Sequence, residues 1–194
     1  MDSVLPRWKG RVFYACPGFL QWETGESWPR SVCFRAVLRI TDTIVETTLI
    51  LFKPDALHRG LVGKILSRFE AKGLQVVGMR LMRMSSELAD THYAEHVDKP
   101  FYPGLKGFMT SSPIIAMALR GPDAIAVARR MMGKTFGIEA EAGTIRGDFG
   151  CSKSYNLVHG SDSPESAARE LGLYFPDGLE DWEPIQAPWL WDAE

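Results

Sequence analysis

The chain has 194 residues, 45% of them hydrophobic, which is enough for one domain with a full core that needs no disulfide or structural metal. Its 22 basic and 24 acidic residues give a formal net charge of -2, which excludes the strong basic field that holds nucleic acid or an anionic membrane. Three cysteines at wide, irregular spacing match neither a disulfide framework nor a zinc site, so we expect reduced thiols and a cytoplasmic protein. A small, local site for an anionic ligand stays compatible with this balance.

Residues 1–46 differ in composition from the rest of the chain. They contain Cys16, Cys33 and several Gly and Pro, and no helical or strand period is sustained before Val37 to Ile40. The apolar run from Val12 to Leu20 is broken by Pro17 and Gly18, so it is too short for a membrane helix and a poor match to a signal peptide. We therefore expect an N-terminal extension over 1–46 and a catalytic domain over 47–194.

An orderly pattern begins at Thr47. Residues 47–53 form an apolar run that predicts a buried strand, which Pro54 ends. Apolar side chains then recur at helical spacing from Leu61 to Phe69, and Gly73 follows where a C-terminal cap belongs. An amphipathic helix that lies on the sheet is the expected result.

The pattern continues with a strand from Leu74 to Leu81 and a helix that Ser85 or Ser86 begins and that runs to about Glu95. Residues 113–119 predict another strand, 123–132 a helix, and Ser163-Pro164 opens a further helix. With a later strand, this order gives a β-α-β-β-α-β plan. We predict an α+β, ferredoxin-like antiparallel sheet with helices on one face and additional C-terminal helices.

The densest group of polar residues lies late in the chain. Gly143 to Phe149 is followed by Asn156 to Asp162 and then by a helix that carries Glu170. Neutral imidazole is a nucleophile at physiological pH, because its unperturbed pKa is about 6.5. A histidine oriented by a carboxylate on its other nitrogen is therefore suited to accept a phosphate, which makes His159 with Glu170 the candidate pair.

Several motifs together resemble the nucleoside diphosphate kinase family over about residues 47–194. They match in order and spacing, and they are Lys53-Pro54-Asp55, residues 59–63, residues 100–105, residues 143–149 and residues 156–166. The resemblance implies transfer of the γ-phosphate of a nucleoside triphosphate to a nucleoside diphosphate. It further implies a ping-pong mechanism, broad base specificity, Mg²⁺ carried on the β- and γ-phosphates, and a homo-oligomer, commonly a hexamer or tetramer.

The resemblance also assigns roles to individual residues. His159 would be the phosphorylated nucleophile, Glu170 its orienting partner, and Ser161 a neighbour. Lys53, Arg129, Thr135 and Arg146 would bind phosphate, which fits the preference of phosphoryl transfer for positioned cations. The remaining matches are Tyr93 in the site, Phe101 stacked on the base, Leu105 as its apolar neighbour, Asn156 with Lys53 at the ribose, and Asp162 near Mg²⁺ through water.

Two other readings of the sequence predict different chemistry. His92-Tyr93-Ala94-Glu95-His96 fits the H-x-x-E-H pattern of zinc hydrolases if both histidines share one helical face. A binding protein on the same fold is the third reading, although the nucleophile and the cations that catalysis needs are all present. The segment from Gly60 to Lys64 lacks the spacing of a phosphate loop, and Ile65 stands where that loop has Ser or Thr.

The chain departs from the family pattern in two loops. Phe136-Gly137 follows Thr135 where the family usually has Asn-Pro, and Lys153-Ser154-Tyr155 replaces the usual small apolar residue, Gly and Arg before Asn156. Lys153 adds a charge beside the expected base site. These changes affect the expected path of the loops and the nucleotide affinity, and they leave the candidate phosphate-transfer residues unchanged.

Overall fold

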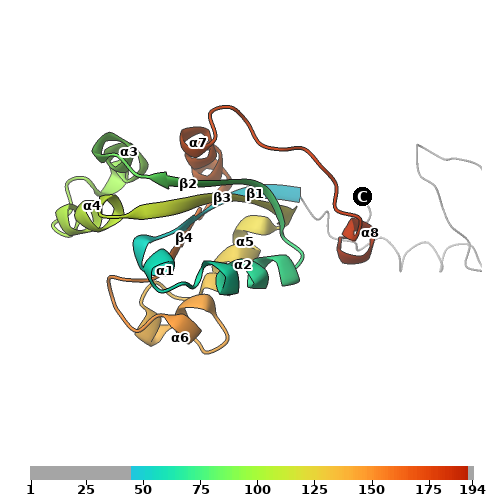
Figure 1. The fold of residues 1–194 in the computed structure, drawn as a ribbon, viewed down its shortest axis with the longest axis horizontal. Helices are drawn as coiled ribbons and strands as arrows, with labels where there is room; N and C mark the ends of the chain where they lie inside the picture. Colours follow the sequence, from blue (N-terminus) through green and yellow to red (C-terminus); the bar gives the residue numbers. More distant parts are fainter. Residues whose placement is uncertain (1–44, 192–194) are drawn as a thin grey trace, which may run out of the picture. The chain divides into compact units, whose positions relative to one another are not determined.

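A computed structural model describes residues 45–191, which form a four-stranded antiparallel sheet in the order β2-β3-β1-β4 (Figure 1). The strands are β1 Val45–Phe52, β2 Gln75–Arg83, β3 Pro113–Pro122 and β4 Val158–Gly160. The expected extension over 1–46 lies outside the described residues, except that its last two residues begin β1.

Strand β1 lies between two partners, which explains its uninterrupted apolar run. Leu49 pairs with Ala118 of β3, and on the other side Leu51 pairs with His159 of β4. Residues 49–52 are fully buried. A strand that is covered on both faces and paired on both edges needs apolar side chains in both alternating positions. This central position is what fixes the short strand that carries His159.

One face of the sheet is covered by the two crossover helices, α2 Val62–Ala71 and α5 Ala124–Met132. Ile65 and Phe69 of α2 and Ala128 of α5 pack in one buried cluster with Ile50 and Phe52. The short helices α1 Pro54–His58 and α6 Ile145–Phe149 join the same side. The predicted β-α-β-β-α-β plan is confirmed, with its two crossover helices on one face.

The other face carries the helices added to that plan, which are α3 Ser86–His92, α4 Tyr102–Thr110 and α7 Pro164–Tyr174 (Figure 1). Their buried side chains, including Met109 and Tyr174, pack on Leu49 and Leu51 of β1. Both faces of the sheet are therefore covered. Because α7 lies over β1, it brings Glu170 near the residue that pairs with Leu51.

The helix expected to run from Ser85 to about Glu95 is shorter than predicted. Ser85 is its N-cap and accepts from Leu88 N at 3.1 Å, but α3 ends at His92 and a separate 3-10 turn, η1 Ala94–His96, follows. Tyr93 between them has φ -100° and ψ 28°, outside the α-helical region. His92 and His96 consequently do not share one continuous helix, as the zinc-hydrolase pattern requires.

The C-terminal segment after α7 runs along β2. Glu180 N donates to Val77 O at 2.9 Å, Trp182 Nε1 donates to Val76 O at 3.2 Å, and Trp191 Nε1 donates to Gly73 O at 3.0 Å just beyond α8 Ala187–Leu190. A second 3-10 turn, η2 Gly137–Glu139, lies between α5 and α6. Among the helices formed by residues 45–191, none has the length and apolar character that crossing a membrane requires.

Removal of residues 1–43 should leave the domain formed by residues 45–191 folded. The register of β1 begins with Val45 opposite Pro122, so a chain that starts at Ile44 retains every strand described above. We expect its turnover to stay within about threefold of the full chain, or about 0.7 kcal/mol. Thermal unfolding and steady-state rates of the two chains test this. A shortened chain that cannot fold would place part of 1–43 in the core.

Candidate functional site

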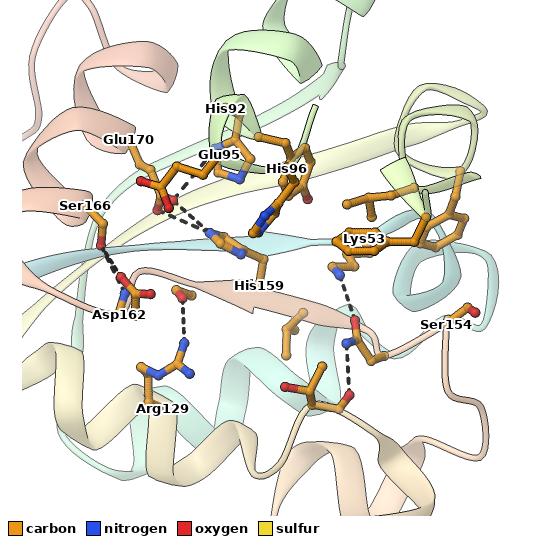
Figure 2. A pocket seen from close by; sticks show the side chains of 18 of the residues that line it. Lys53, His92, Glu95, His96, Arg129, Ser154, His159, Asp162, Ser166 and Glu170 are labelled. Carbon is orange, nitrogen blue, oxygen red and sulfur yellow. Dashed lines mark hydrogen bonds and ion pairs between the residues drawn. The ribbon is translucent and has the colours of Figure 1, made fainter. Parts of the chain in front are cut away.

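His159 and Glu170 form the centre of a cavity of about 1070 Å³ (Figure 2). His159 Nε2 lies 3.1 Å and 3.2 Å from the two carboxylate oxygens of Glu170. The Glu170 side chain is buried, and Ser161 Oγ donates to its Oε2 at 2.7 Å. Ser161 is in turn held by Leu49 N of β1 at 3.3 Å. The backbone of the central strand thus fixes the carboxylate that holds the histidine.

The ionisation of Glu170 decides which nitrogen of His159 is free. Burial raises the pKa of Glu170, but its hydrogen bond and charge interaction with His159, together with the Ser161 hydrogen bond, outweigh burial and give a net lowering. An ionised carboxylate only accepts hydrogen bonds, so Nε2 of His159 must carry the proton. The lone pair of neutral His159 is therefore on Nδ1.

The start of α7 positions Glu170. Ser163 Oγ accepts from Ser166 N at 3.1 Å, and Ser166 Oγ accepts from Ser163 N at 3.0 Å, which forms a reciprocal capping box. Pro164 occupies the first turn. Asp162 is fixed in the same way, because its Oδ1 accepts from Ser166 Oγ at 2.8 Å on the cavity wall (Figure 2).

Two guanidinium groups line the cavity beside His159. Arg129 of α5 donates through Nη1 to Gly160 O at 3.2 Å. Arg146 of α6 donates to three carbonyls, those of Asn156 at 3.2 Å, Gly133 at 2.9 Å and Val158 at 2.8 Å. Burial and the charge of Arg129 lower the pKa of Arg146 to about 10. Two positive charges on one cavity wall, of which Arg146 is buried and Arg129 is exposed, form a place where an anion is electrostatically favoured.

Lys53 is the third cation, and it stands at the end of β1 as the N-cap of α1. Its Nζ donates to Asn156 Oδ1 at 2.7 Å, and Asn156 Nδ2 donates to Thr135 O at 3.0 Å (Figure 2). Burial, followed by the charge of Arg146, lowers the pKa of Lys53 to about 8, although Asp55 acts in the opposite direction. The ammonium group is therefore poorly compensated within the protein.

The turn before β4 has an unusual backbone. Leu157 has φ +69°, a left-handed conformation that is rare for a residue with a branched side chain. Asp55 Oδ2 accepts from Leu157 N at 3.0 Å, and Lys53 N donates to Leu157 O at 2.8 Å. These bonds hold the strained turn, so that Asn156 faces Lys53 while Val158 continues into the strand. Strain of this kind is common at functional sites.

Gly160, next to His159, is closely approached by two core side chains. A Cβ at this position would lie 2.8 Å from Met132 Sδ and 3.0 Å from Ile50 Cδ1. The absence of a side chain lets β4 pack closely on α5, the helix that carries Arg129.

The other end of the cavity is apolar. Phe101, the residue before α4, is 57% exposed and lines the opening together with Leu105 and Tyr93. Tyr155 packs on Phe108 of α4 with ring centroids 4.8 Å apart, so the loop that differs from the family pattern forms part of this wall. The cavity thus has a cationic end and an aromatic end.

The structure brings the predicted site residues together. All of them line this cavity except Ser161, which lies behind Glu170: Lys53, Tyr93, Phe101, Leu105, Arg129, Thr135, Arg146, Asn156, His159, Asp162 and Glu170. Phe136, Lys153 and Ser154 from the two atypical loops line it as well. Their roles in binding and catalysis are taken up below as proposals.

Sequence reasoning missed the place of His92. Its ring is fully buried and lies edge-on to His159, with centroids 4.7 Å apart. His96, its expected partner in a zinc site, is exposed and lies beside Phe101 at 5.7 Å between ring centroids. The H-x-x-E-H pattern therefore does not describe the surroundings of His92, whose ring neighbours include His159 rather than His96.

If Lys53 contributes its charge to anion binding in this cavity, that binding should weaken above pH 8. Its pKa of about 8 in the folded chain is below 10.5, so the unfolded chain binds more protons between these values and stability rises with pH there. The fraction of Lys53 that carries a positive charge falls over the same pH range. If only the charged form binds, kcat/KM should fall by about tenfold per pH unit above that pKa.

The matched control is Lys53→Arg, because guanidinium keeps its proton throughout this range. Its kcat/KM should change little between pH 7 and 9.5, whatever its absolute value. A wild-type profile that is equally flat would show that the charge of Lys53 does not contribute to binding.

Comparison with known proteins places these features in a family. The family model described as nucleoside diphosphate kinase matches residues 46–179. A nucleoside diphosphate kinase of Synechococcus sp. (strain JA-3-3Ab) is 50% identical over 149 residues, which is 76% of this chain and 100% of the relative. One from Nocardia farcinica is 56% identical over 135 residues, covering 69% of this chain and 97% of the relative.

The fold agrees with a solved structure. A halophilic nucleoside diphosphate kinase from Halobacterium salinarum, in complex with CDP, superposes with a TM-score of 0.75 at 45% identity, covering 77% of this chain and 100% of the other. Since the matches include the whole domain that holds the cavity, this chain belongs to the nucleoside diphosphate kinase family.

Proposed function

We propose that this chain is a nucleoside diphosphate kinase that transfers the γ-phosphate of a nucleoside triphosphate to a nucleoside diphosphate through a phosphohistidine at His159. The observation that carries the proposal is the hydrogen bond from His159 Nε2 to buried Glu170, because it leaves Nδ1 as the nucleophile inside a cationic cavity. Relatives that share about half of the sequence bear the same name, and one relative was solved with CDP.

In the first half-reaction, Nδ1 of His159 attacks the γ-phosphorus and forms a P–N bond as the bond from phosphorus to the β–γ bridging oxygen breaks. The nucleoside diphosphate leaves with that electron pair. The proton on Nε2 stays in place, and the positive charge that develops on the ring is stabilised by the Glu170 carboxylate. The second nucleoside diphosphate reverses these steps in the same site, which is a ping-pong mechanism.

The cations supply the electrostatic part of catalysis. The charge of Arg129 lowers the pKa of Arg146, and the charge of Arg146 lowers the pKa of Lys53, so a phosphate chain among these groups relieves repulsion that already exists. Thr135 and Asn156 connect these groups to the α5–α6 loop. Phosphoryl transfer needs mainly such positioning and charge neutralisation.

The aromatic end of the cavity is the proposed base site. Phe101 presents an exposed ring and lines the cavity together with Leu105 and Tyr93, and we assign the ribose to Lys53 and Asn156, which line the same cavity. A stacking surface accepts any base, because every base has a π face. We therefore propose broad base specificity.

Mg²⁺ is proposed to arrive with the nucleotide, neutralising charge on its phosphates. Asp162 offers a hard oxygen donor at the cavity wall, but one of its oxygens is already bound to Ser166. A single carboxylate in that state fits a contact through water better than a direct cage. We also propose a cytoplasmic homo-oligomer, supported by the apolar side chains of Met79 and Leu81 that edge strand β2 leaves exposed.

The function is tested with pure protein, ATP as donor and a panel of GDP, CDP and UDP as acceptors. All three should be converted, and initial rates at varied donor and acceptor should give the parallel reciprocal lines of a ping-pong reaction. Preference among bases should stay below about a hundredfold, or about 2.7 kcal/mol. Intersecting lines would refute the phosphoenzyme, and a larger preference would require contacts to the base edge.

A further inference from the structure

His92 is a buried imidazole that the proposed reaction does not use. Its side chain is fully buried, and neither ring nitrogen has a hydrogen-bond partner among residues 45–191. A buried polar group without a partner destabilises a protein by about 1–3 kcal/mol, so its presence requires an explanation. Burial, then the charge of His159, lowers the pKa of His92 to about 3, and the neutral ring therefore has an available lone pair at physiological pH.

The ring of His92 faces the two residues that perform the proposed chemistry. His92 Nδ1 lies 3.9 Å from Glu170 Oε1, and His159 Nε2 lies 3.1 Å from the same oxygen. One ligand atom from each of the three residues can be chosen so that all lie within 4.8 Å of one another (Figure 2). Within residues 45–191, this is the one group of three potential metal ligands from His, Cys, Asp and Glu side chains.

The donor set matches a particular class of metal. Two imidazoles and one carboxylate are a common zinc-binding set, with bonds of about 2.0–2.2 Å and a fourth position left for water. Such bonds place neighbouring ligand atoms about 3.4 Å apart in a tetrahedral site. The distance of 3.9 Å between His92 and Glu170 is therefore near the required value, and the site needs small side-chain rotations to bring all three ligand atoms from within 4.8 Å to bonding positions.

We propose that His92, His159 and Glu170 form an inhibitory site for a divalent transition metal of the zinc class. The inhibitory part rests on the proposed function, whereas metal binding does not. Nitrogen ligands favour Zn²⁺ and Co²⁺ over Mg²⁺, which prefers oxygen, so the metal that accompanies the nucleotide does not compete for this site.

Inhibition follows from the position of the bond. The metal binds Nε2 of His159 and takes the carboxylate that otherwise accepts the Nε2 proton. In the neutral, metal-bound ring that proton moves to Nδ1, so Nδ1 has no lone pair left with which to attack phosphorus. In phosphorylated His159 the proton stays on Nε2, which donates it to the Glu170 carboxylate. Phosphorylation and metal binding therefore exclude each other.

The first test is spectroscopic and uses the full wild-type chain with Co²⁺ and no nucleotide. Visible absorption bands of tetrahedral Co²⁺ should appear and saturate at about one metal per chain. Phosphorylation with ATP and removal of the nucleotide should abolish those bands. X-ray absorption of the zinc-loaded chain should report two imidazoles and oxygen, whereas a sulfur ligand from Cys151 would overturn the assignment.

The second test compares His92→Phe with the matched control His96→Gln in transfer assays with Zn²⁺ at constant Mg²⁺ and ATP. Each rate is expressed relative to the same variant without zinc. Because ATP is constant, it chelates the same share of the zinc in every assay, and the half-inhibiting concentrations can be compared directly. His92→Phe should raise the half-inhibiting zinc concentration at least about tenfold, as loss of a metal contact does. His96→Gln should leave it within about twofold, because His96 is outside the set.

The outcomes separate this proposal from the proposed function. Equal zinc inhibition of all three proteins, or cobalt bands that persist in His92→Phe, would refute the site. A chain that takes no phosphate from ATP would refute the proposed function, while cobalt binding would still decide the metal site. If His92→Phe does not fold, the cobalt and X-ray measurements on the wild type decide it.

Discussion

Replacement of His159 by alanine should remove both labelling of the protein by γ-labelled ATP and transfer to a diphosphate. Neither Glu170 nor Ser161 can take over, because the first is an oriented, buried carboxylate and the second donates its proton to that carboxylate. Loss of a nucleophile that acts as a unit with its partner should cost at least about 10⁴-fold in kcat. The measurement is radiolabel on the chain and steady-state turnover.

The matched control is His58→Ala. His58 is exposed and bonded to Ser112 at 2.8 Å, and it does not line the cavity. This variant should label like the wild type. The wild-type label should be stable in base and labile in acid, as a P–N bond is, and unlabelled GDP should remove it as GTP. Labelling of His159→Ala at the wild-type rate would place the phosphate on another residue.

Glu170→Gln should slow phosphoenzyme formation by about 10²- to 10⁴-fold, the upper figure being that of a catalytic imidazole forced into the wrong tautomer. A glutamine amide can donate to Nε2, which would move the ring proton to Nδ1, the nitrogen that has to attack. The amide also removes the negative charge that stabilises the ring during transfer. Rapid-quench labelling gives the rate, and ¹⁵N imidazole shifts of His159 report the tautomer.

Ser161→Ala tests the hydrogen bond that supports the Glu170 carboxylate separately from the charge of that carboxylate. It removes one hydrogen bond at 2.7 Å but keeps the charge of Glu170, so its cost should be limited to about 1.5–3 kcal/mol and its His159 tautomer should remain that of the wild type. A Glu170→Gln protein that labels as fast as Ser161→Ala would show that the tautomer is set by another group.

The long elements of the fold were predictable because each has a clear period. The run 47–53, the repeat from Leu61 to Phe69 and the Ser163-Pro164 start all correspond to observed elements. The short helices α1, α4 and α6 were not predicted, since five to nine residues that contain Pro or Gly show little amphipathic period. Tertiary contacts and caps, such as Thr144 accepting from Gly147 N at 3.1 Å, determine them.

The prediction of which residues form the site depended on the family resemblance, because the residues alone suggested only part of the set. Local sequence indicated His159 with Glu170, but the pairing of Ile50 with Gly160, across more than a hundred residues, is what aligns β4 with β1. The place of His92 could not be read locally either. Its H-x-x-E-H spacing predicted a shared helix face, whereas Tyr93 ends α3 and α7 supplies the actual neighbour, Glu170.

The three carbonyl bonds of Arg146 connect the stability of the domain to its ligand. Guanidinium has five N–H groups, and three of them already hold the backbone at Gly133, Asn156 and Val158. Folding has therefore already removed the rotational freedom of this side chain, about 2 kcal/mol for arginine, so a phosphate that binds the remaining donors loses little entropy there. By linkage, a nucleotide that binds Arg146 in the folded chain and not in the unfolded chain should raise the melting temperature. A lower rate in an Arg146 variant would therefore combine two effects. One is the loss of the proposed contact with the anion, and the other is the loss of the hydrogen bonds that hold three backbone segments.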